Sequence, residues 1–186
     1  MTRILGISGS LRAGSYNTAL LRAVRDLTAD QVELEIATLH GIPLYDADFE
    51  QREGLPSAVL ELKAKIMASD GVMLATPEYN NGIPGVFKNG VDWLSRPPAD
   101  IPKIFRRPFA IIGASPGGFG TILSQAAWLP VLRSLGAPVW NGGRLMVSRA
   151  SQVFDAHGAI ADEAMRGQLR KFTLGFAAFV AEQSSE

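Results

Sequence analysis

The chain has 186 residues, of which 47% are hydrophobic and 19% charged, and its 18 basic residues balance its 18 acidic ones. This composition excludes an intrinsically disordered chain, and the length fits a single globular domain over residues 1–186. The zero net charge gives no overall attraction to nucleic acid or to an anionic membrane, and the absence of cysteine excludes disulfides, thiolate metal sites and a cysteine nucleophile.

The N-terminal segment does not read as a secretory signal. Only a few apolar residues precede Ser8-Gly9-Ser10, whereas a signal core needs roughly 7–15. No stretch approaches the ~18 apolar residues of a membrane span. We therefore expect a cytoplasmic protein without membrane insertion.

Short apolar runs alternate with helical patterns along the chain. Strands are expected at residues 3–7, 32–36, 71–75, 108–113 and 144–148. Helices are expected at residues 16–28, in a segment capped by Ser57, from Pro84 to Leu94, from the end of a glycine-rich loop to Leu135, and at about 159–182. The residues from Gly41 to Pro56 and those beginning at Pro97 are expected to be loops.

Five strands alternating with five helices predict an α/β fold with a parallel sheet and helices on both of its faces. With right-handed crossovers, the expected strand order is 2-1-3-4-5. Ligands of such folds bind beyond the carboxyl ends of the strands, near the switch point between strands 1 and 3. Three loops of unusual composition emerge at that edge, at residues 8–17, 76–83 and 114–120.

The first of these loops is rich in groups that bind anions. Gly9 and Gly14 let the backbone curl around an anion, and the start of the following helix offers unpaired N–H groups. Further donors are the side chains of Ser8, Ser10, Arg12, Ser15 and Asn17. On the alternative interpretation, Ser15 only caps the helix and Arg12 is a solvated surface residue.

The spacing within this loop indicates which phosphate ligand it suits. A nucleoside-triphosphate loop needs a Lys-Ser/Thr pair, which is missing here. A dinucleotide fingerprint needs Gly-x-Gly-x-x-Gly and an acidic residue at the end of the second strand, whereas the glycines are Gly6, Gly9 and Gly14 and that strand ends at Ala37-Thr38. A single terminal phosphate, as in FMN, fits the hydroxyl-rich loop better.

The second and third loops suit a flat ring with a polar edge. In the second loop Pro77 stiffens the chain, Tyr79 can stack, and Gly82 permits close approach of the backbone. In the third loop, hydroxyl and backbone donors come from Ser115, Gly117 and Gly118. Alternatively the second loop is an ordinary turn, with Glu78 solvated and Asn80-Asn81 merely turn-forming.

The three loops carry the motifs Gly9-Ser10-Leu11-Arg12-x-x-Ser15-x-Asn17, Pro77-Glu78-Tyr79-Asn80 followed by Pro84-x-x-x-Lys88-Asn89-x-x-Asp92-Trp93, and Ser115-Pro116-Gly117-Gly118. Together these motifs resemble the NADPH-dependent FMN reductase family, which includes bacterial quinone and chromate reductases and some azoreductases. The resemblance covers nearly the whole chain.

The resemblance implies a flavodoxin-like three-layer sandwich with bound FMN, and a homodimer or homotetramer with the flavin near the subunit interface. It assigns the FMN phosphate to Ser10, Arg12, Ser15 and Asn17. It assigns the isoalloxazine ring to Pro77, Glu78, Tyr79 and Asn80 on one side, and to Ser115, Gly117 and Gly118 on the other.

The expected reaction passes a hydride from NADPH or NADH to the flavin, and then two electrons to a quinone or a similar acceptor such as an azo compound, chromate or free flavin. The cofactor supplies this chemistry, so we assign no catalytic acid or base and no metal site. One alternative is a flavodoxin-type electron carrier, although such carriers are strongly acidic and this chain is neutral. A nucleotide-dependent hydrolase or transferase is a second alternative, which the missing lysine argues against.

Other polar residues receive structural interpretations. His40 and His157 each lie beside a glycine and are expected in surface loops. Asp46 and Asp48 are expected to be solvated rather than to hold a metal.

Aromatic residues on the helices are expected in the core or at a subunit interface. Phe172, Phe176 and Phe179 recur at helical spacing and are expected in the core. We expect dimerisation through apolar surface on the two helices that carry Phe87, Val91, Trp93 and Trp128.

Overall fold

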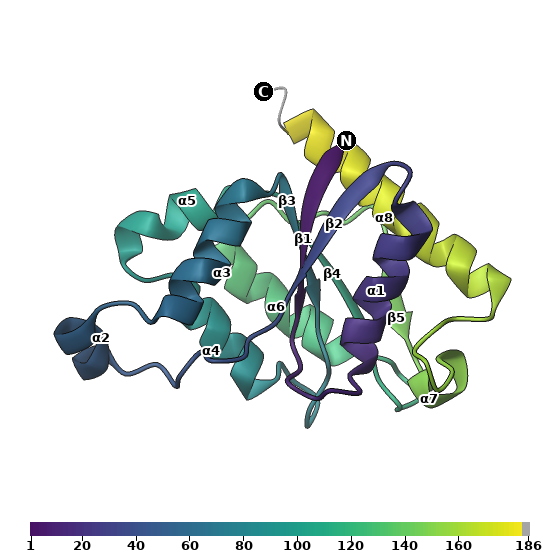
Figure 1. The fold of residues 1–186 in the computed structure, drawn as a ribbon, viewed down its shortest axis with the longest axis horizontal. Coiled ribbons are helices and arrows are strands. Elements are labelled where there is room, and N and C mark those ends of the chain that lie inside the picture. The colour runs from purple at the N-terminus through teal and green to yellow at the C-terminus, as the bar shows by residue number, and fades with distance from the viewer. Residues whose placement is uncertain (184–186) are drawn as a thin grey trace.

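The computed structural model describes residues 1–183 and contains one five-stranded parallel sheet (Figure 1). Its strands are β1 (Thr2–Ser8), β2 (Val32–Ala37), β3 (Gly71–Ala75), β4 (Phe109–Ala114) and β5 (Leu145–Val147). Their order is β2-β1-β3-β4-β5, and every neighbouring pair is parallel. The predicted strand order is confirmed.

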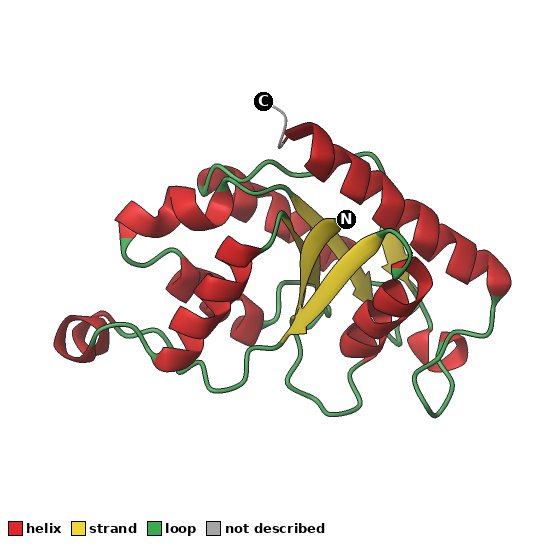
Figure 2. Cartoon of the chain, turned by 45° about the horizontal axis from the view of Figure 1, so that its top comes forward, coloured by secondary structure: helices red, strands yellow, loops and turns green. Residues whose placement is uncertain are grey.

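Helices cover both faces of the sheet, as Figure 2 shows. One face carries α1 (Tyr16–Thr28) and α8 (Glu163–Gln183), and the other carries α3 (Ser57–Ala68), α4 (Gly85–Leu94) and α6 (Ile122–Ser134). Shorter elements are α2 (Ala47–Glu53), the 3-10 helix η1 (Pro98–Asp100), α5 (Ile101–Phe105) and α7 (Ala150–Val153). This is the predicted flavodoxin-like three-layer sandwich.

Successive side chains of each strand point to opposite faces of the sheet and therefore pack into two separate cores. Ile4 points into the core under α1 and α8, whereas its neighbour Leu5 points into the core under α3, α4 and α6. In the second core, Phe87 and Trp128 meet edge to face with ring centres 4.9 Å apart. Each fully buried side chain of this size contributes about 1.5–3 kcal/mol to folding.

The loop predicted from Gly41 to Pro56 contains a helix. α2 is capped by Asp46, whose Oδ1 accepts hydrogen bonds from the backbone N–H groups of Asp48 at 2.9 Å and Phe49 at 3.3 Å. No residue of α2 is buried, so the helix shows no apolar periodicity, and this is why the sequence pattern missed it. Asp46 is therefore a helix cap as well as a solvated carboxylate.

Several helix boundaries also differ from the prediction. Ser57 does not cap α3, because Pro56 occupies the cap position and no side chain caps the helix. The loop predicted after Pro97 contains η1 and α5. α8 begins at Glu163 rather than at residue 159, because residues 154–160 form a turn in which Phe154 and Ile160 pair as an isolated β-bridge.

The four aromatic and apolar residues for which both the core and a subunit interface were considered lie in the core. Phe87, Val91, Trp93 and Trp128 are between 0% and 3% exposed and belong to the core. The exposed apolar side chains near the start of α6 and along it are Phe119, Ile122, Leu123 and Leu129. On α6, packing against the sheet separates the buried Trp128 from the exposed Ile122, Leu123 and Leu129.

No helix within residues 1–183 is long and apolar enough to cross a membrane. In the same part of the chain, no cluster of three or more His, Asp or Glu side chains is arranged to hold a metal ion.

Candidate functional site

The three predicted loops meet at the carboxyl edge of the sheet, at the bottom of Figure 1. Loop 1 (residues 9–15) follows β1, loop 2 (residues 76–84) follows β3, and loop 3 (residues 115–121) follows β4. Backbone hydrogen bonds continue the sheet into the loops, from Gly9 N to Ala75 O and from Thr76 N to Ile112 O, each 2.9 Å long. The loops therefore leave the sheet from fixed positions.

Loop 1 presents a group of unpaired backbone donors. Within residues 1–183, no hydrogen bond is made by the backbone N–H groups of Ser10, Leu11, Ala13, Gly14, Tyr16 and Asn17. The last two belong to the first turn of α1, where the helix dipole adds partial positive charge. Backbone donors grouped in this way can bind an anion.

Among the side chains of loop 1, two serines are buried and accept hydrogen bonds from the backbone, whereas Arg12 is exposed. Ser15 accepts from the N–H of Thr18 at 3.3 Å and so caps α1, and Ser10 accepts from the N–H of Arg12 at 3.3 Å. Both serines are buried, and each hydroxyl proton stays free to donate to an anion. Arg12 is exposed and forms no ion pair with any described residue, so its guanidinium is available.

Asn17 is 3% exposed and links loop 1 to the end of β4. Its Nδ2 donates to the carbonyl of Ala114, and its Oδ1 accepts from the N–H of Ala114, both at 2.9 Å. One Nδ2 proton and its backbone N–H remain for a ligand. This linking role was not predicted from the sequence.

Gly9 is required by packing rather than by a special backbone angle. A Cβ atom there would lie 2.1 Å from Cδ1 of Phe87 and 2.9 Å from Cδ of Pro77. Real Cβ contacts are never that short, so loop 1 sits this deep only with glycine at this position. Phe87 belongs to the first turn of α4, and loop 1 and loop 2 are therefore packed on each other.

Loop 2 contains a two-residue hairpin. Tyr79 and Gly82 exchange backbone hydrogen bonds of 3.2 and 3.1 Å, and Asn80 and Asn81 both have positive φ, at 50° and 61°. Asparagine tolerates this left-handed conformation, which a type I′ turn requires at both positions. Tyr79 is 51% exposed, so its ring is free to stack on a ligand.

Glu78 has a structural contact that the sequence did not indicate. Its Oε2 accepts from the backbone N–H groups of Leu123 at 2.8 Å and Ser124 at 2.9 Å, in the first turn of α6. Thr121, at the cap position of that helix, makes no capping hydrogen bond, so Glu78 performs this role from loop 2. Because Oε2 is occupied in this way, Glu78 can contact the ring of a ligand only through its backbone or through Oε1.

The buried hydroxyl group of Thr76 links loop 2 to the rest of the fold. Thr76 is fully buried, and its Oγ1 accepts from Nε1 of Trp128 at 3.1 Å and lies 2.8 Å from Oγ of Ser124. It also donates to the carbonyl of Pro77 at 2.9 Å. These bonds join loop 2 to α6, and no sequence motif predicted them because the partners are 48 and 52 residues away.

Loop 3 is held by backbone hydrogen bonds near its start and is exposed at its tip. The carbonyl groups of Ser115 and Gly117 accept from the N–H groups of Ala150 and Arg149, both at 3.0 Å. Oγ of Ser115 accepts from the N–H of Gly117 at 3.1 Å. Gly117 and Gly118 are exposed, which leaves the backbone of the tip accessible.

The carboxyl groups with shifted pKa values lie in the scaffold rather than in the three loops. Hydrogen bonds from Lys103 and Lys63 lower the pKa of Asp100 to about 2. Hydrogen bonds from the backbone N–H groups of Ala159 and His157 lower the pKa of Asp155. These groups are ionised in the folded state and hold loops in place.

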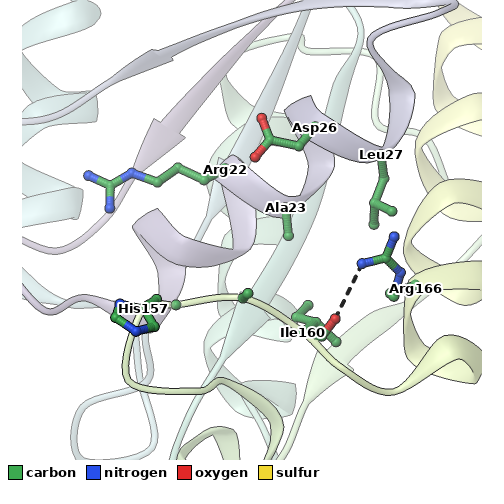
Figure 3. Close-up of a pocket in the computed structure, with 9 residues that line it drawn as sticks. Arg22, Ala23, Asp26, Leu27, His157, Ile160 and Arg166 are labelled. Carbon is green, nitrogen blue, oxygen red and sulfur yellow. Dashed lines mark hydrogen bonds between the residues drawn. The ribbon is translucent and has the colours of Figure 1, made fainter.

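A pocket of about 230 Å³ lies away from the predicted site (Figure 3). It is lined by α1, by residues 157–160 and by Arg166, whose Nη1 donates to the carbonyl of Ile160 at 3.5 Å. None of the predicted binding residues lines it.

The structure brings all the predicted site residues to this one edge. The fold defines a flavodoxin-like α/β protein, with three loops meeting at the carboxyl ends of β1, β3 and β4. The model of the family described as NADPH-dependent FMN reductase matches residues 2–152, and the chain belongs to that family.

Curated relatives span most of the chain. An NAD(P)H-dependent FMN reductase of Pseudomonas aeruginosa is 42% identical over 164 residues, which are 88% of this chain and 87% of the relative. A quinone reductase of Escherichia coli K12 is 35% identical over 176 residues, covering 91% of this chain and 93% of the relative.

A solved structure agrees with this fold. FerB, a flavoenzyme NAD(P)H:(acceptor) oxidoreductase of Paracoccus denitrificans, superposes with a TM-score of 0.88 at 30% identity. The superposition covers 98% of this chain and 99% of FerB.

Proposed function

We propose that this chain is an FMN-dependent oxidoreductase that takes electrons from NADPH or NADH and passes them to a quinone or a similar small acceptor. The observation that carries the proposal is the set of unpaired N–H groups in loop 1, at the edge where loop 2 and loop 3 also emerge. Membership of the NADPH-dependent FMN reductase family and the activities named for its relatives support it.

The residues of loop 1 fit a terminal phosphate. Its free N–H groups, the hydroxyls of Ser10 and Ser15 and the guanidinium of Arg12 together supply donors and one positive charge. Asn17 adds one donor from its side chain. No acidic side chain lies in loop 1, so nothing there repels a dianion.

The residues of the other two loops fit a flat ring. The exposed ring of Tyr79 offers apolar surface, while Asn80 and the backbone of Glu78 offer polar groups beside it. Pro77 is itself buried and stiffens the start of the loop. Ser115, Gly117 and Gly118 approach the same edge from β4. The N–H of Gly118 and the hydroxyl proton of Ser115 are available there, whereas the N–H groups of Ser115 and Gly117 donate to the carbonyl of Val147 and to Oγ of Ser115.

When bound, FMN would supply the hydride and electron transfer, as such cofactors do. The residues of loop 1 would hold its phosphate, and those of loop 2 and loop 3 would orient its ring. We assign no catalytic acid or base.

We further propose a homodimer or homotetramer in the cytoplasm. The exposed side chains of Phe119, Ile122, Leu123 and Leu129 make loop 3 and α6 the preferred interface. Sedimentation of a monomer at micromolar concentration would contradict this assembly.

The direct test of the function is an absorbance spectrum of the purified protein with added FMN, followed by anaerobic NADPH. We expect bound flavin bands that bleach on addition of NADPH and return on addition of a quinone. Binding without bleaching would favour an electron carrier fed by another protein. No binding of FMN would overturn the assignment of all three loops.

A further inference from the structure

His40 connects the end of β2 to loop 1. Its Nε2 lies 3.2 Å from the carbonyl oxygen of Leu11, and its Nδ1 lies 3.0 Å from Oγ1 of Thr38. A carbonyl only accepts, so Nε2 carries the proton and donates to Leu11. In the neutral imidazole, Nδ1 then accepts from the hydroxyl of Thr38, which fixes the ring from its other side.

This contact is unusual among the hydrogen bonds of loop 1. Within residues 1–183, it is the only hydrogen bond that reaches residues 10–14 from outside loop 1. The remaining bonds of these residues join Arg12 to Ser10, Gly14 and Ser15. The middle of loop 1 is therefore anchored to the rest of the fold by the imidazole of His40.

The anchor acts on a peptide group at the centre of the donor cluster. The carbonyl of Leu11 and the N–H of Arg12 belong to one planar peptide and point in opposite directions. His40 holds the carbonyl on one side, and Oγ of the buried Ser10 holds the N–H on the other. With this peptide fixed, the free N–H groups of Leu11 and Ala13 on either side of it keep their directions.

We propose that His40 is a positioning residue for the anion-binding loop, so that it favours the binding of flavins that carry a phosphate. This inference rests on the proposed function, since it takes the phosphate of FMN as the anion. Among the described residues, His40 forms no hydrogen bond with loop 2 or loop 3. Its removal should therefore weaken binding of the phosphate and leave binding of the ring unchanged.

The test compares two ligands that differ only in the phosphate, FMN and riboflavin. Apoprotein is titrated with each flavin, and quenching of flavin fluorescence gives the dissociation constants for wild type, His40→Leu and His40→Gln. Loss of one hydrogen bond predicts that His40→Leu binds FMN about three- to tenfold more weakly, with riboflavin unchanged. His40→Gln keeps an N–H donor and should recover most of the FMN affinity.

Two further variants sharpen the comparison. His157 is the other histidine of the chain and lies in the exposed turn after α7, so His157→Leu should leave both affinities unchanged. Thr38→Val removes the hydroxyl that fixes Nδ1 of His40, and a smaller loss of FMN affinity is expected. Melting temperatures of all variants show whether each one is folded.

Each contrary outcome has a separate meaning. Equal FMN affinity for folded His40→Leu and wild type would overturn the role of His40 and leave the proposed function intact. An equal loss for FMN and riboflavin would also overturn it, because a general distortion of the site is then the cause. Failure of the wild-type protein to bind either flavin would overturn the proposed function and this inference together.

Discussion

Asn17 and Ala114 form a reciprocal pair of hydrogen bonds, in which the side-chain amide of one residue matches the backbone N–H and C=O of the other at 2.9 Å. The two residues are 97 positions apart in the chain. This pair fixes the distance between the start of α1 and the end of β4, and therefore between loop 1 and loop 3.

Replacement of Asn17 by alanine should destabilise the fold strongly. Both backbone groups of Ala114 would remain buried without a partner, and each such group costs about 1–3 kcal/mol. Urea unfolding of Asn17→Ala should therefore show a loss of about 2–6 kcal/mol. The control is Asn141→Ala, an exposed asparagine with one hydrogen bond to Val139, for which a loss below about 1 kcal/mol is expected. Equal losses for the two variants would contradict the importance of the Ala114 pair.

A methyl group at position 9 should displace loop 1. Gly9→Ala would bring its Cβ to within 2.1 Å of the buried ring of Phe87, and overpacking of this kind costs about 1–3 kcal/mol. Thermal unfolding and FMN titration should show a lower melting temperature and weaker binding. Gly167→Ala is the matched control, because its Cβ would meet nothing within 4 Å on an exposed face of α8, and it should be neutral or stabilising. Wild-type behaviour of Gly9→Ala would show that loop 1 does not depend on this close approach.

Removal of the charge of Arg12 should weaken FMN binding. Arg12 has no ion-pair partner among the described residues, so Arg12→Ala leaves the fold intact while removing a positive charge from the donor cluster. We expect about a tenfold rise in the dissociation constant of FMN, and a smaller dependence of that constant on salt than in wild type. Arg22→Ala, an exposed arginine on α1, serves as the control and should leave both quantities unchanged. Unchanged FMN affinity of Arg12→Ala would remove Arg12 from the phosphate site.

Stability at low pH should depend on Asp100. Its pKa is lowered from 3.8 to about 2 by hydrogen bonds from Lys103 and Lys63, and Lys63 is itself buried. A folded-state pKa below the unfolded value means that the contribution is complete above pH 3.8 and is lost as the pH falls toward 2. Asp100→Asn should therefore be less stable than wild type at neutral pH, and the difference should shrink in acid. Urea unfolding at a series of pH values measures this, and a difference that stays constant down to the lowest pH would contradict it.

Local patterns were sufficient for the sheet and for the principal helices. Strand β3 is a run of buried apolar residues, α1 repeats Leu20, Leu21 and Val24 on one face, and α6 ends where Gly136 takes a positive φ of 73°. These signals are contained within a few neighbouring residues, and alternation of strands and helices then restricts the order of the sheet. The sequence pattern did not predict α2, because none of its residues is buried and the helix therefore has no apolar face.

The sequence by itself determined the fold, the family and which residues make up the three loops. Glycine spacing, hydroxyl content and turn-forming residues are features of neighbouring positions in the chain. The tertiary structure alone decided what those residues contact. Asn17 pairs with Ala114, Glu78 caps α6, and His40 holds Leu11, across separations of 97, 45 and 29 residues. The same is true of Phe87 and Trp128, which pack inside the core. Such contacts depend on where the sheet brings distant segments together, and no periodicity within one segment carries that information.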